Sequence, residues 1–352
     1  MKRRSFSLFS LLLFSFPPFS FSQSPAPLIS KIAFGSCGSQ DKPQPILDSV
    51  IRHQPDVFIW LGDNIYGDTK DMQVLKNKYA KLAAKPEFQR LKKSTRFLAT
   101  WDDHDYGWND AGRHYPFKKE SKEIFLQFWE EPADSPRRQH EGIYTSYMFE
   151  SGGKKLQVIL LDNRTFRDDL RIYRGELSHD EQFFYPLDYY PHEIKDSTLL
   201  GEAQWRWLEA ELRKSADLRI IGSGSQFSIS FNGYEAWANF PHERQRMLDL
   251  IKKTRANGVV FITGDVHYGE ISVLKDKDLY PIYDVTASGI TSTWHFATPN
   301  DNRIEGPIMD NHFGLISIDW QQKDPAVKME IYDIRGNQRV EHGVRLSEIS
   351  FK

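Results

Sequence analysis

Acidic and metal-binding side chains follow directly after an apolar run in the first fifth of the chain. Residues 57–61 are all apolar, which predicts a buried parallel strand, and Gly62, Asp63 and Asn64 come next. In α/β sheets, functional residues gather beyond the carboxyl ends of strands, and a glycine there permits a tight turn. Asp63 is therefore a candidate metal ligand, although an Asp-Asn pair is also typical of a turn or a helix cap.

The same order recurs along the sequence: an apolar run predicts a strand, and Asp, Asn, His or Cys side chains follow it. Buried charges must be paired or bound to a metal, so such clusters are unusual beside a core strand. Because strand ends can converge on one edge of an α/β fold, the clusters are expected to form one site. The groups concerned are Cys37, Asp63, Asp103 with His104, Asp162, the loop at 222–226, and Asp265 with His267.

This set of side chains suits a hydrolase with two metal ions, which clamp a phosphate, bind the attacking hydroxide and neutralise the developing charge. Asp63 is the expected bridge between the ions. A carboxylate and an amide carbonyl, as in Asp103 and Asn109, suit hard cations such as Ca²⁺, Mg²⁺ or Mn²⁺. A thiolate and a phenolate, as in Cys37 and Tyr66, suit a more polarising transition metal.

Several of these side chains also have a purely structural interpretation. Cys37 is the only cysteine of the chain and could be a small buried packing residue. Tyr66 could be an amphipathic packing residue. His104 could be a core residue or a helix-end cap, but beside Asp103 it is equally suited to act as a general acid or phosphate contact. Asp68 is interpreted as a surface acid.

Alternating strands and helices are expected to position these residues. Residues 165–199 show no clear periodicity, and we expect an irregular surface loop near the site there. Strands are expected at 31–35, 57–61, 96–100, 144–149, 156–161, 218–221, 259–263, 283–287, 315–320 and 327–334. Helices are expected at 46–53, 71–84, 86–93, 120–129, 202–214 and 242–256.

The chain has 352 residues and a formal net charge of −2, so no long-range field favours nucleic acid or an anionic membrane. Residues 1–22 are interpreted as a signal peptide, with a basic start, a short apolar core and a small-residue cleavage site. The pair Arg3-Arg4 fits a twin-arginine signal loosely. Residues 23–30 are then a linker and 31–352 the mature domain, expected to be secreted or periplasmic without a transmembrane anchor.

Three motifs in order resemble the metal motifs of the calcineurin-like metallophosphoesterases: Gly62-Asp63-x-x-Tyr66, Trp101-Asp102-Asp103-His104-Asp105 and Gly264-Asp265-Val266-His267. Further details resemble the PhoD-like alkaline phosphatase/phosphodiesterase branch. They are Ser36-Cys37, Leu161-Asp162-Asn163-Arg164 and Gly201-Glu202-x-Gln204-Trp205-x-Trp207-Leu208. The resemblance covers residues 31 to 290 and implies an α/β fold, a four-layer sandwich of two mixed β-sheets flanked by helices.

The resemblance also implies roles for single residues. Cys37, Tyr66 and Asp265 would bind Fe³⁺, and Asp63 would bridge it to Ca²⁺; Zn, Mn or Mg are the alternative metals. Asp103, Asn109 and His267 would complete the calcium side. His104 occupies the position of the phosphate-contacting acid or base. Arg164 is a candidate phosphate contact, or else forms an ion pair with a neighbouring acid such as Asp162.

The expected function is therefore exported, metal-dependent hydrolysis of small-molecule or polymer phosphate esters by a metal-bound hydroxide. Residues 165–199 and 289–304, the latter with Trp294 and His295, are expected to decide between monoesters and diesters. One alternative is a phosphodiesterase directed at lipid or wall polymers, in which the aromatic residues of the loop at 165–199 would bind an apolar substrate. The other is a non-catalytic protein that keeps the metal site for structure.

Overall fold

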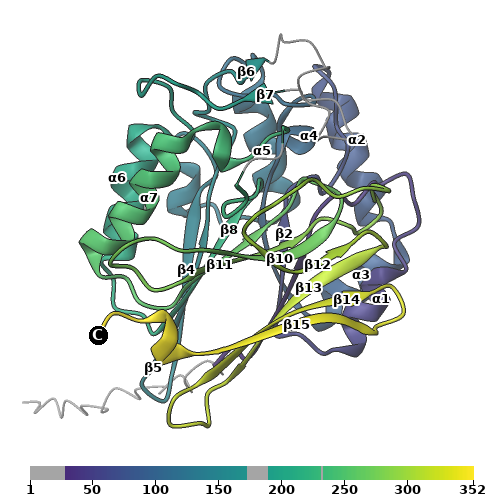
Figure 1. Ribbon diagram of the computed structural model, residues 1–352. Helices are drawn as coiled ribbons and strands as arrows, with labels where there is room; N and C mark the ends of the chain where they lie inside the picture. The colour runs from purple at the N-terminus through teal and green to yellow at the C-terminus, as the bar shows by residue number, and fades with distance from the viewer. Residues whose placement is uncertain (1–27, 173–188, 231–232) are drawn as a thin grey trace, which may run out of the picture.

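Two mixed β-sheets face each other in the computed structural model, which describes residues 28–172, 189–230 and 233–352 (Figure 1). The first sheet has six strands in the order β15-β14-β13-β1-β2-β3. Within this sheet, β1, β2 and β3 run parallel to one another, and the other neighbouring pairs are antiparallel. The strands are β1 (Lys31–Gly35), β2 (Val57–Leu61), β3 (Arg96–Thr100), β13 (His312–Asp319), β14 (Ala326–Asp333) and β15 (Gln338–Arg345).

The second sheet has seven strands in the order β12-β10-β11-β9-β8-β5-β4. Four of them, β5, β8, β9 and β11, run parallel, and antiparallel strands complete both sides. The strands are β4 (Thr145–Ser151), β5 (Lys154–Leu160), β8 (Leu218–Ser223), β9 (Val259–Thr263), β10 (Gly269–Leu274), β11 (Ile282–Ala287) and β12 (Arg303–Ile308).

Helices cover the outer face of each sheet, because alternate side chains of a strand point to opposite faces. In β2, Ile59 and Leu61 pack in the core between the sheets, whereas Phe58 and Trp60 pack toward helices. Those helices are α1 (Ile46–Arg52), α2 (Met72–Ala83), α3 (Pro86–Ser94) and α5 (Lys118–Phe128). On the opposite side, α6 (Gly201–Leu212) and α7 (Pro241–Thr254) cover the second sheet (Figure 1). The expected four-layer α/β sandwich is thus confirmed.

Shorter elements connect these layers. A single helical turn, α4 (Asp103–Tyr106), follows β3, and the strand pair β6 (Arg171–Ile172) and β7 (Tyr189–Tyr190) lies near it at the same end of the molecule (Figure 1). In the part of the chain that the structure describes, 3-10 helices span Pro136–Arg138, Trp237–Asn239 and Leu346–Ile349. The irregular excursion expected at 165–199 thus includes a short β-ribbon, and its residues 173–188 lie outside the described part.

Three strands of the two large sheets are absent from the predicted set: β10, β12 and β15. β12 and β15 are edge strands whose residues are mostly exposed or half-buried, and β10 lies next to the edge, where the polar residues Glu270 and Ser272 interrupt its apolar residues. Their sequences, such as Arg303–Ile308 with its Gly-Pro pair, therefore lack the pattern of a core strand. The proposed signal peptide and most of the linker at 23–30 lie outside the described residues. Within the described ranges, no helix is long and apolar enough to cross a membrane.

Candidate metal centre

The carboxyl ends of strands from both sheets meet at one place. Cys37 follows β1, Asp63 follows β2, Asp103 follows β3 and Asp265 follows β9. The turns hydrogen-bond directly to one another: Gly38 N donates to the Asp63 carbonyl at 2.8 Å. The Cys37 Sγ atom lies 3.5 Å both from Asp63 Oδ2 and from the Asp265 carbonyl oxygen. The convergence expected from the sequence therefore occurs.

Four overlapping groups of side chains could each hold a cation, with ligand atoms within 4.8 Å of one another. Asp63 belongs to two of these groups, and Asp103 belongs to three, so these carboxylates join the groups into one site. The groups are Cys37 with Asp63 and His267; Asp63 with Asp103 and His104; Asp102 with Asp103 and Asp265; and Asp103 with Asp110 and Glu235.

The backbone at this site adopts an unusual conformation. Cys37, Asp63, Asp265 and His267 have positive φ angles of 60°, 48°, 77° and 54°, which non-glycine residues adopt rarely and at an energetic cost. Gly62 at the same turn has a φ of +103°, and a Cβ atom there would lie 2.4 Å from the Asp102 Cβ. Strain of this kind persists where the surrounding structure fixes it, and it clusters at functional sites.

Burial dominates the electrostatics of the site. It raises the pKa of Asp63 well above its usual range, and the charges of Asp103 and Asp102 add to the effect. Burial also raises the pKa values of Cys37 and Asp265, each next to other acids. For Asp103, burial acts in the same direction, but the charges of Arg164 and His104 outweigh it and lower the pKa to about 2. Without a cation, this cluster would hold protons on several ligands.

His104 is held by an acid that the sequence did not single out. Its Nδ1 atom lies 2.7 Å from Asp68 Oδ1, and its Nε2 atom lies 3.9 Å from Asp103 Oδ2. Burial would lower the pKa of His104, but the hydrogen bond with Asp68 and the charge of Asp103 outweigh it and raise the pKa to about 9. Asp68 is exposed, as predicted for a surface acid, but it also contacts His104 and helps to set the orientation and charge of this imidazole.

Tyr66 also faces the site. Its hydroxyl oxygen lies 3.1 Å from His267 Nε2 and donates to Ser292 Oγ at 3.2 Å. Burial, followed by the charges of Cys37 and Asp63, raises the pKa of this phenol. Burial lowers the pKa of His267 to about 4, with the charge of His104 acting in the same direction, so its imidazole is neutral at pH 7, as a metal ligand must be.

Arg164 lies beneath the site rather than on its surface. Its guanidinium is 1% exposed and pairs with Asp102 at 2.5 Å, Glu235 at 2.5 Å and Asp103 at 3.5 Å. The ion pair with Asp162 that the sequence offered as an alternative does not form. Asp162 instead accepts hydrogen bonds from neutral donors, namely Trp101 Nε1, the backbone of Ile143, Arg164 and Thr165, and the Thr165 hydroxyl.

A cavity of about 180 Å³ opens onto this centre. Asp110 and Glu235 line it but are absent from the predicted set; Asp110 adjoins the predicted ligand Asn109, whereas Glu235 sits in an irregular loop with no sequence signal. Aromatic rings of Tyr189, Tyr234 and Trp294 complete the wall. Six of the nine predicted residues line it directly: Asp63, Asp103, His104, Asn109, Asp265 and His267.

The donor set fits a metal centre. Asp63 Oδ1 is buried yet accepts no hydrogen bond from the described residues. Asp63 is also the residue that the sequence predicts as the bridge between two ions. A buried carboxylate oxygen without a partner is costly, and a cation would satisfy it. Asp63 shares one group of potential ligands with the Cys37 thiol and the His267 imidazole, and the Tyr66 phenol lies 3.1 Å from that imidazole. Such a mixture of donors suits a transition metal beside a harder ion.

The fold is one that other solved proteins share. The solved structure of PhoD superposes with a TM-score of 0.64 at 18% sequence identity, over 91% of this chain and 73% of that one. GAP50, the anchor in the inner membrane complex of Plasmodium, superposes with a TM-score of 0.57 at 13% identity, over 93% and 90% of the two chains. This likeness shows a shared fold, two facing mixed sheets flanked by helices.

The chain belongs to the PhoD-like phosphatase family, whose model matches residues 33–340. Its sequence is 24% identical over 245 residues to alkaline phosphatase D of Bacillus subtilis (strain 168). The match spans 62% of this chain but only 40% of the length of that relative. The family resemblance seen in the sequence motifs is thereby confirmed.

Proposed function

We propose that this chain is an exported, metal-dependent phosphoric ester hydrolase, with residues 1–22 as its signal and 31–352 as its catalytic domain. One observation carries the proposal: the ends of β1, β2, β3 and β9 bring a thiol and three carboxylates together, and the three carboxylates line a small cavity. Membership of the PhoD-like phosphatase family supports the same chemistry.

The resemblance to the family implies the metal ligands, and the donor types of Cys37, Tyr66, Asp103 and Asn109 agree with it. Cys37, Tyr66, Asp63 and Asp265 would hold Fe³⁺, while Asp63, Asp103, Asn109 and His267 would hold Ca²⁺, with Zn, Mn or Mg as alternatives. Bound metals of this kind supply Lewis acidity and lower the pKa of water. Metal binding would also displace the protons that burial keeps on Asp63 and Cys37. The affinity for metal should therefore rise with pH.

His104 is the general acid of this proposal. Its raised pKa keeps the imidazolium charged at pH 7, and Asp68 holds the Nδ1 side, so the Nε2 proton is directed toward Asp103 and the cavity. There it would donate a proton to the leaving alkoxide or bind a phosphoryl oxygen. Arg164 would act indirectly, by holding Asp102, Asp103 and Glu235 in place.

The cavity wall favours phosphodiesters as a second candidate substrate class. No lysine or arginine is among the described residues that line it, so His104 is the cationic side chain there that a monoester dianion could meet. Tyr234 and Trp294 lie 5.0 Å apart between ring centroids, and Trp294 lies 5.4 Å from His267. These rings could contact an apolar second ester group, as in a lipid or wall-polymer diester.

Rates on a nitrophenyl monoester and a bis-nitrophenyl diester test the proposal. We expect hydrolysis of both by the metal-loaded protein, a higher rate on the diester, and loss of both activities in Asp63→Asn. Ferric iron bound by Cys37 and Tyr66 should also give a visible charge-transfer band. A colourless preparation with full activity and no iron would favour zinc or manganese, and inactivity of a fully loaded protein on both esters would contradict the proposal.

A further inference from the structure

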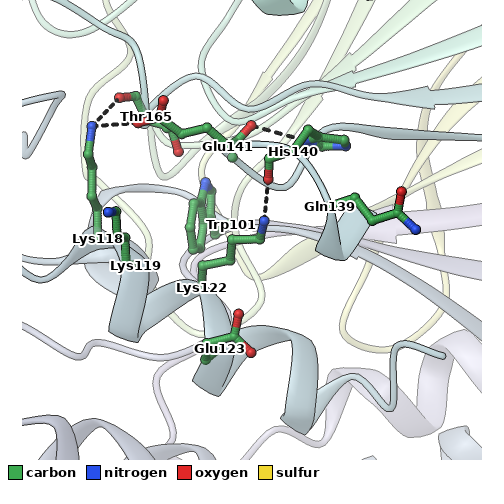
Figure 2. Close-up of a pocket in the computed structure, with 10 residues that line it drawn as sticks. Trp101, Lys118, Lys119, Lys122, Glu123, Gln139, His140, Glu141 and Thr165 are labelled. Carbon is green, nitrogen blue, oxygen red and sulfur yellow. Dashed lines mark hydrogen bonds and ion pairs between the residues drawn. The ribbon is translucent and has the colours of Figure 1, made fainter. Parts of the chain in front are cut away.

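A second cavity, of about 500 Å³, lies beside the start of α5, and three lysines of that helix line it (Figure 2). Lys118, Lys119 and Lys122 occupy its first turns. Trp101 also lines it and is drawn between Lys119 and Lys122, and the segment with His140 and Glu141 lies above the helix in this view (Figure 2). No residue of this cavity lines the one at the candidate metal centre.

The positive charge of this cavity is only partly neutralised. Lys118 pairs with Glu141 at 2.9 Å, and the other acid at the cavity, Glu123, pairs with Arg138 at 3.6 Å. Among the described residues, neither Lys119 nor Lys122 has a carboxylate oxygen within 4.0 Å. Two ammonium groups at the cavity therefore lack a close counter-charge.

Lys122 is the more unusual of the two, because it is only 9% exposed. Its ammonium donates to the backbone carbonyl of His140 (Figure 2), which is a neutral acceptor, and an ammonium has three donors to satisfy. Burial lowers the pKa of Lys122, although Glu123 and Asp162 oppose this from beyond ion-pair distance. A buried ammonium without a counter-charge is unfavourable, and an anion in the cavity would relieve it.

The start of α5 adds to the attraction. Its N-cap residue, Phe117, supplies no side-chain hydrogen bond, so the first backbone N–H groups are not capped by it. The positive end of the helix dipole therefore lies where Lys118 and Lys119 begin the helix, and such ends favour anions. The buried Lys122 and the uncapped helix start are separate observations that indicate the same kind of ligand.

We propose that this cavity binds an oxyanion of the phosphate class, either free phosphate or the phosphoryl group of a small ester. Several ammonium donors on one side suit a ligand with several oxygen acceptors. The volume exceeds that of a phosphate, which leaves room for an attached organic group. The inference rests on the lysines and on the start of α5, and it does not depend on catalysis at the metal centre.

The cavity is nevertheless connected to that centre. Trp101 Nε1 donates to Asp162 at 3.0 Å, and the Thr165 hydroxyl donates to the same carboxylate at 2.7 Å. Trp101 and Thr165 line the cavity, and their chain neighbours Asp102 and Arg164 form the ion pair beneath the metal site. An anion bound in this cavity would thus contact residues that adjoin Asp102 and Arg164 in the sequence, the two groups that position the candidate metal ligands.

Equilibrium dialysis of labelled phosphate against the metal-loaded mature protein, at constant ionic strength, tests the proposal. We expect Lys122→Met to bind one phosphate fewer per chain than the wild type, while the competitive inhibition constant of phosphate stays unchanged. Lys119→Gln, an exposed change that should not affect folding, should weaken the same site about tenfold. The matched control is Lys93→Met on α3, which should bind as the wild type does.

Equal phosphate stoichiometry and affinity in the wild type, Lys122→Met and Lys119→Gln would overturn the proposal. If Lys122→Met fails to fold, the affinity of Lys119→Gln decides alone. Failure of the catalytic proposal would look different, since phosphate would then not inhibit hydrolysis, while the lysine-dependent binding would remain. Dialysis with methylphosphonate and with a longer hydroxyalkyl phosphonate separates the sources: tighter binding of the longer one indicates a phosphoryl ester.

Discussion

At the residue scale, the interaction between His104 and Asp68 gives the site its proposed proton donor. The two side chains lie 2.7 Å apart, and Asp68 is partly exposed at 40%. A histidine with a pKa of about 9 remains protonated across neutral pH, whereas an ordinary histidine titrates near pH 6.5. Asp68 thereby sets the pH range in which His104 can act as an acid.

Asp68→Asn should lower turnover about ten- to hundredfold, because general acid catalysis contributes on that order or more. The acid must be protonated, so activity is lost as pH rises through its pKa. Without Asp68 that pKa falls, and the alkaline limb of the pH–rate profile should move to lower pH. The measurement is kcat against pH, with metal content determined in parallel and Asp278→Asn, an exposed turn position, as the control. An unshifted alkaline limb would exclude this role.

Arg164 is the second residue whose role can be decided by measurement. Arg164→Met should reduce the free energy of unfolding by about 3–5 kcal/mol, because it leaves the buried carboxylates of Asp102, Asp103 and Glu235 without a counter-charge. The loss should be larger at pH 8 than at pH 6. Buried carboxylates that lack a counter-charge have pKa values in the folded state above those in the unfolded state, so the free energy of unfolding falls as pH rises.

Urea unfolding of Arg164→Met beside Arg206→Met measures this effect. Arg206 is exposed on α6, and its change should stay within about 0.5 kcal/mol of the wild type. If Arg164→Met instead kept its stability and only raised KM, Arg164 would be the substrate contact that the sequence offered as the first interpretation.

At the element scale, the turns that follow the strands hold the ligands, and a later segment holds the turns. Ile290 N and Thr291 N donate to the carbonyls of Ser36 and Cys37, and Trp294 N donates to the His267 carbonyl. The segment at 289–304 therefore braces two ligand turns while it brings Trp294 to the cavity. This placement agrees with the expectation that the segment influences substrate choice, which remains a prediction.

Gly62→Ala tests how tightly the turn after β2 is specified. The new Cβ would lie 2.4 Å from Asp102 Cβ at a φ of +103°, so both sterics and backbone conformation oppose it. We expect a loss of several kcal/mol in stability, on the order of 2–4, and a loss of metal binding. Gly343→Ala in β15, where nothing lies within 4 Å of the added Cβ, should be nearly neutral. Equal Tm values for both variants would show that the turn tolerates a side chain.

At the scale of the whole molecule, the sequence predicts the core strands and the ligands that follow them. Strands such as β2 and β9 are unbroken apolar runs, and the next polar residue must sit at the sheet edge, so Asp63 and Asp265 could be identified. Glu235 could not, because the irregular loop between β8 and α7 carries it. The role of Asp68 depends on how the chain folds back toward α4, which no periodicity encodes.

The partner of Arg164 shows the same limit. The nearest acid in sequence, Asp162, is already satisfied by neutral donors, and the acids that pair with Arg164 come from distant segments. The edge strands β12 and β15 were missed because largely exposed strands lose the apolar run, and β10 was missed because polar residues interrupt it. The core and the ligand positions are thus encoded locally, whereas the charge pairing that supports them arises from tertiary structure.

Elemental analysis of the active protein tests the central claim, a two-metal centre bridged by Asp63, most directly. Metal equivalents per chain should be measured beside phosphoesterase activity for the wild type, for Asp63→Asn and for the exposed control Asp278→Asn. The account predicts two metal ions in the active wild type and control, with loss of both metal and activity in Asp63→Asn. A metal-free wild type with full activity, or an Asp63→Asn variant that keeps its metals and its activity, would contradict it.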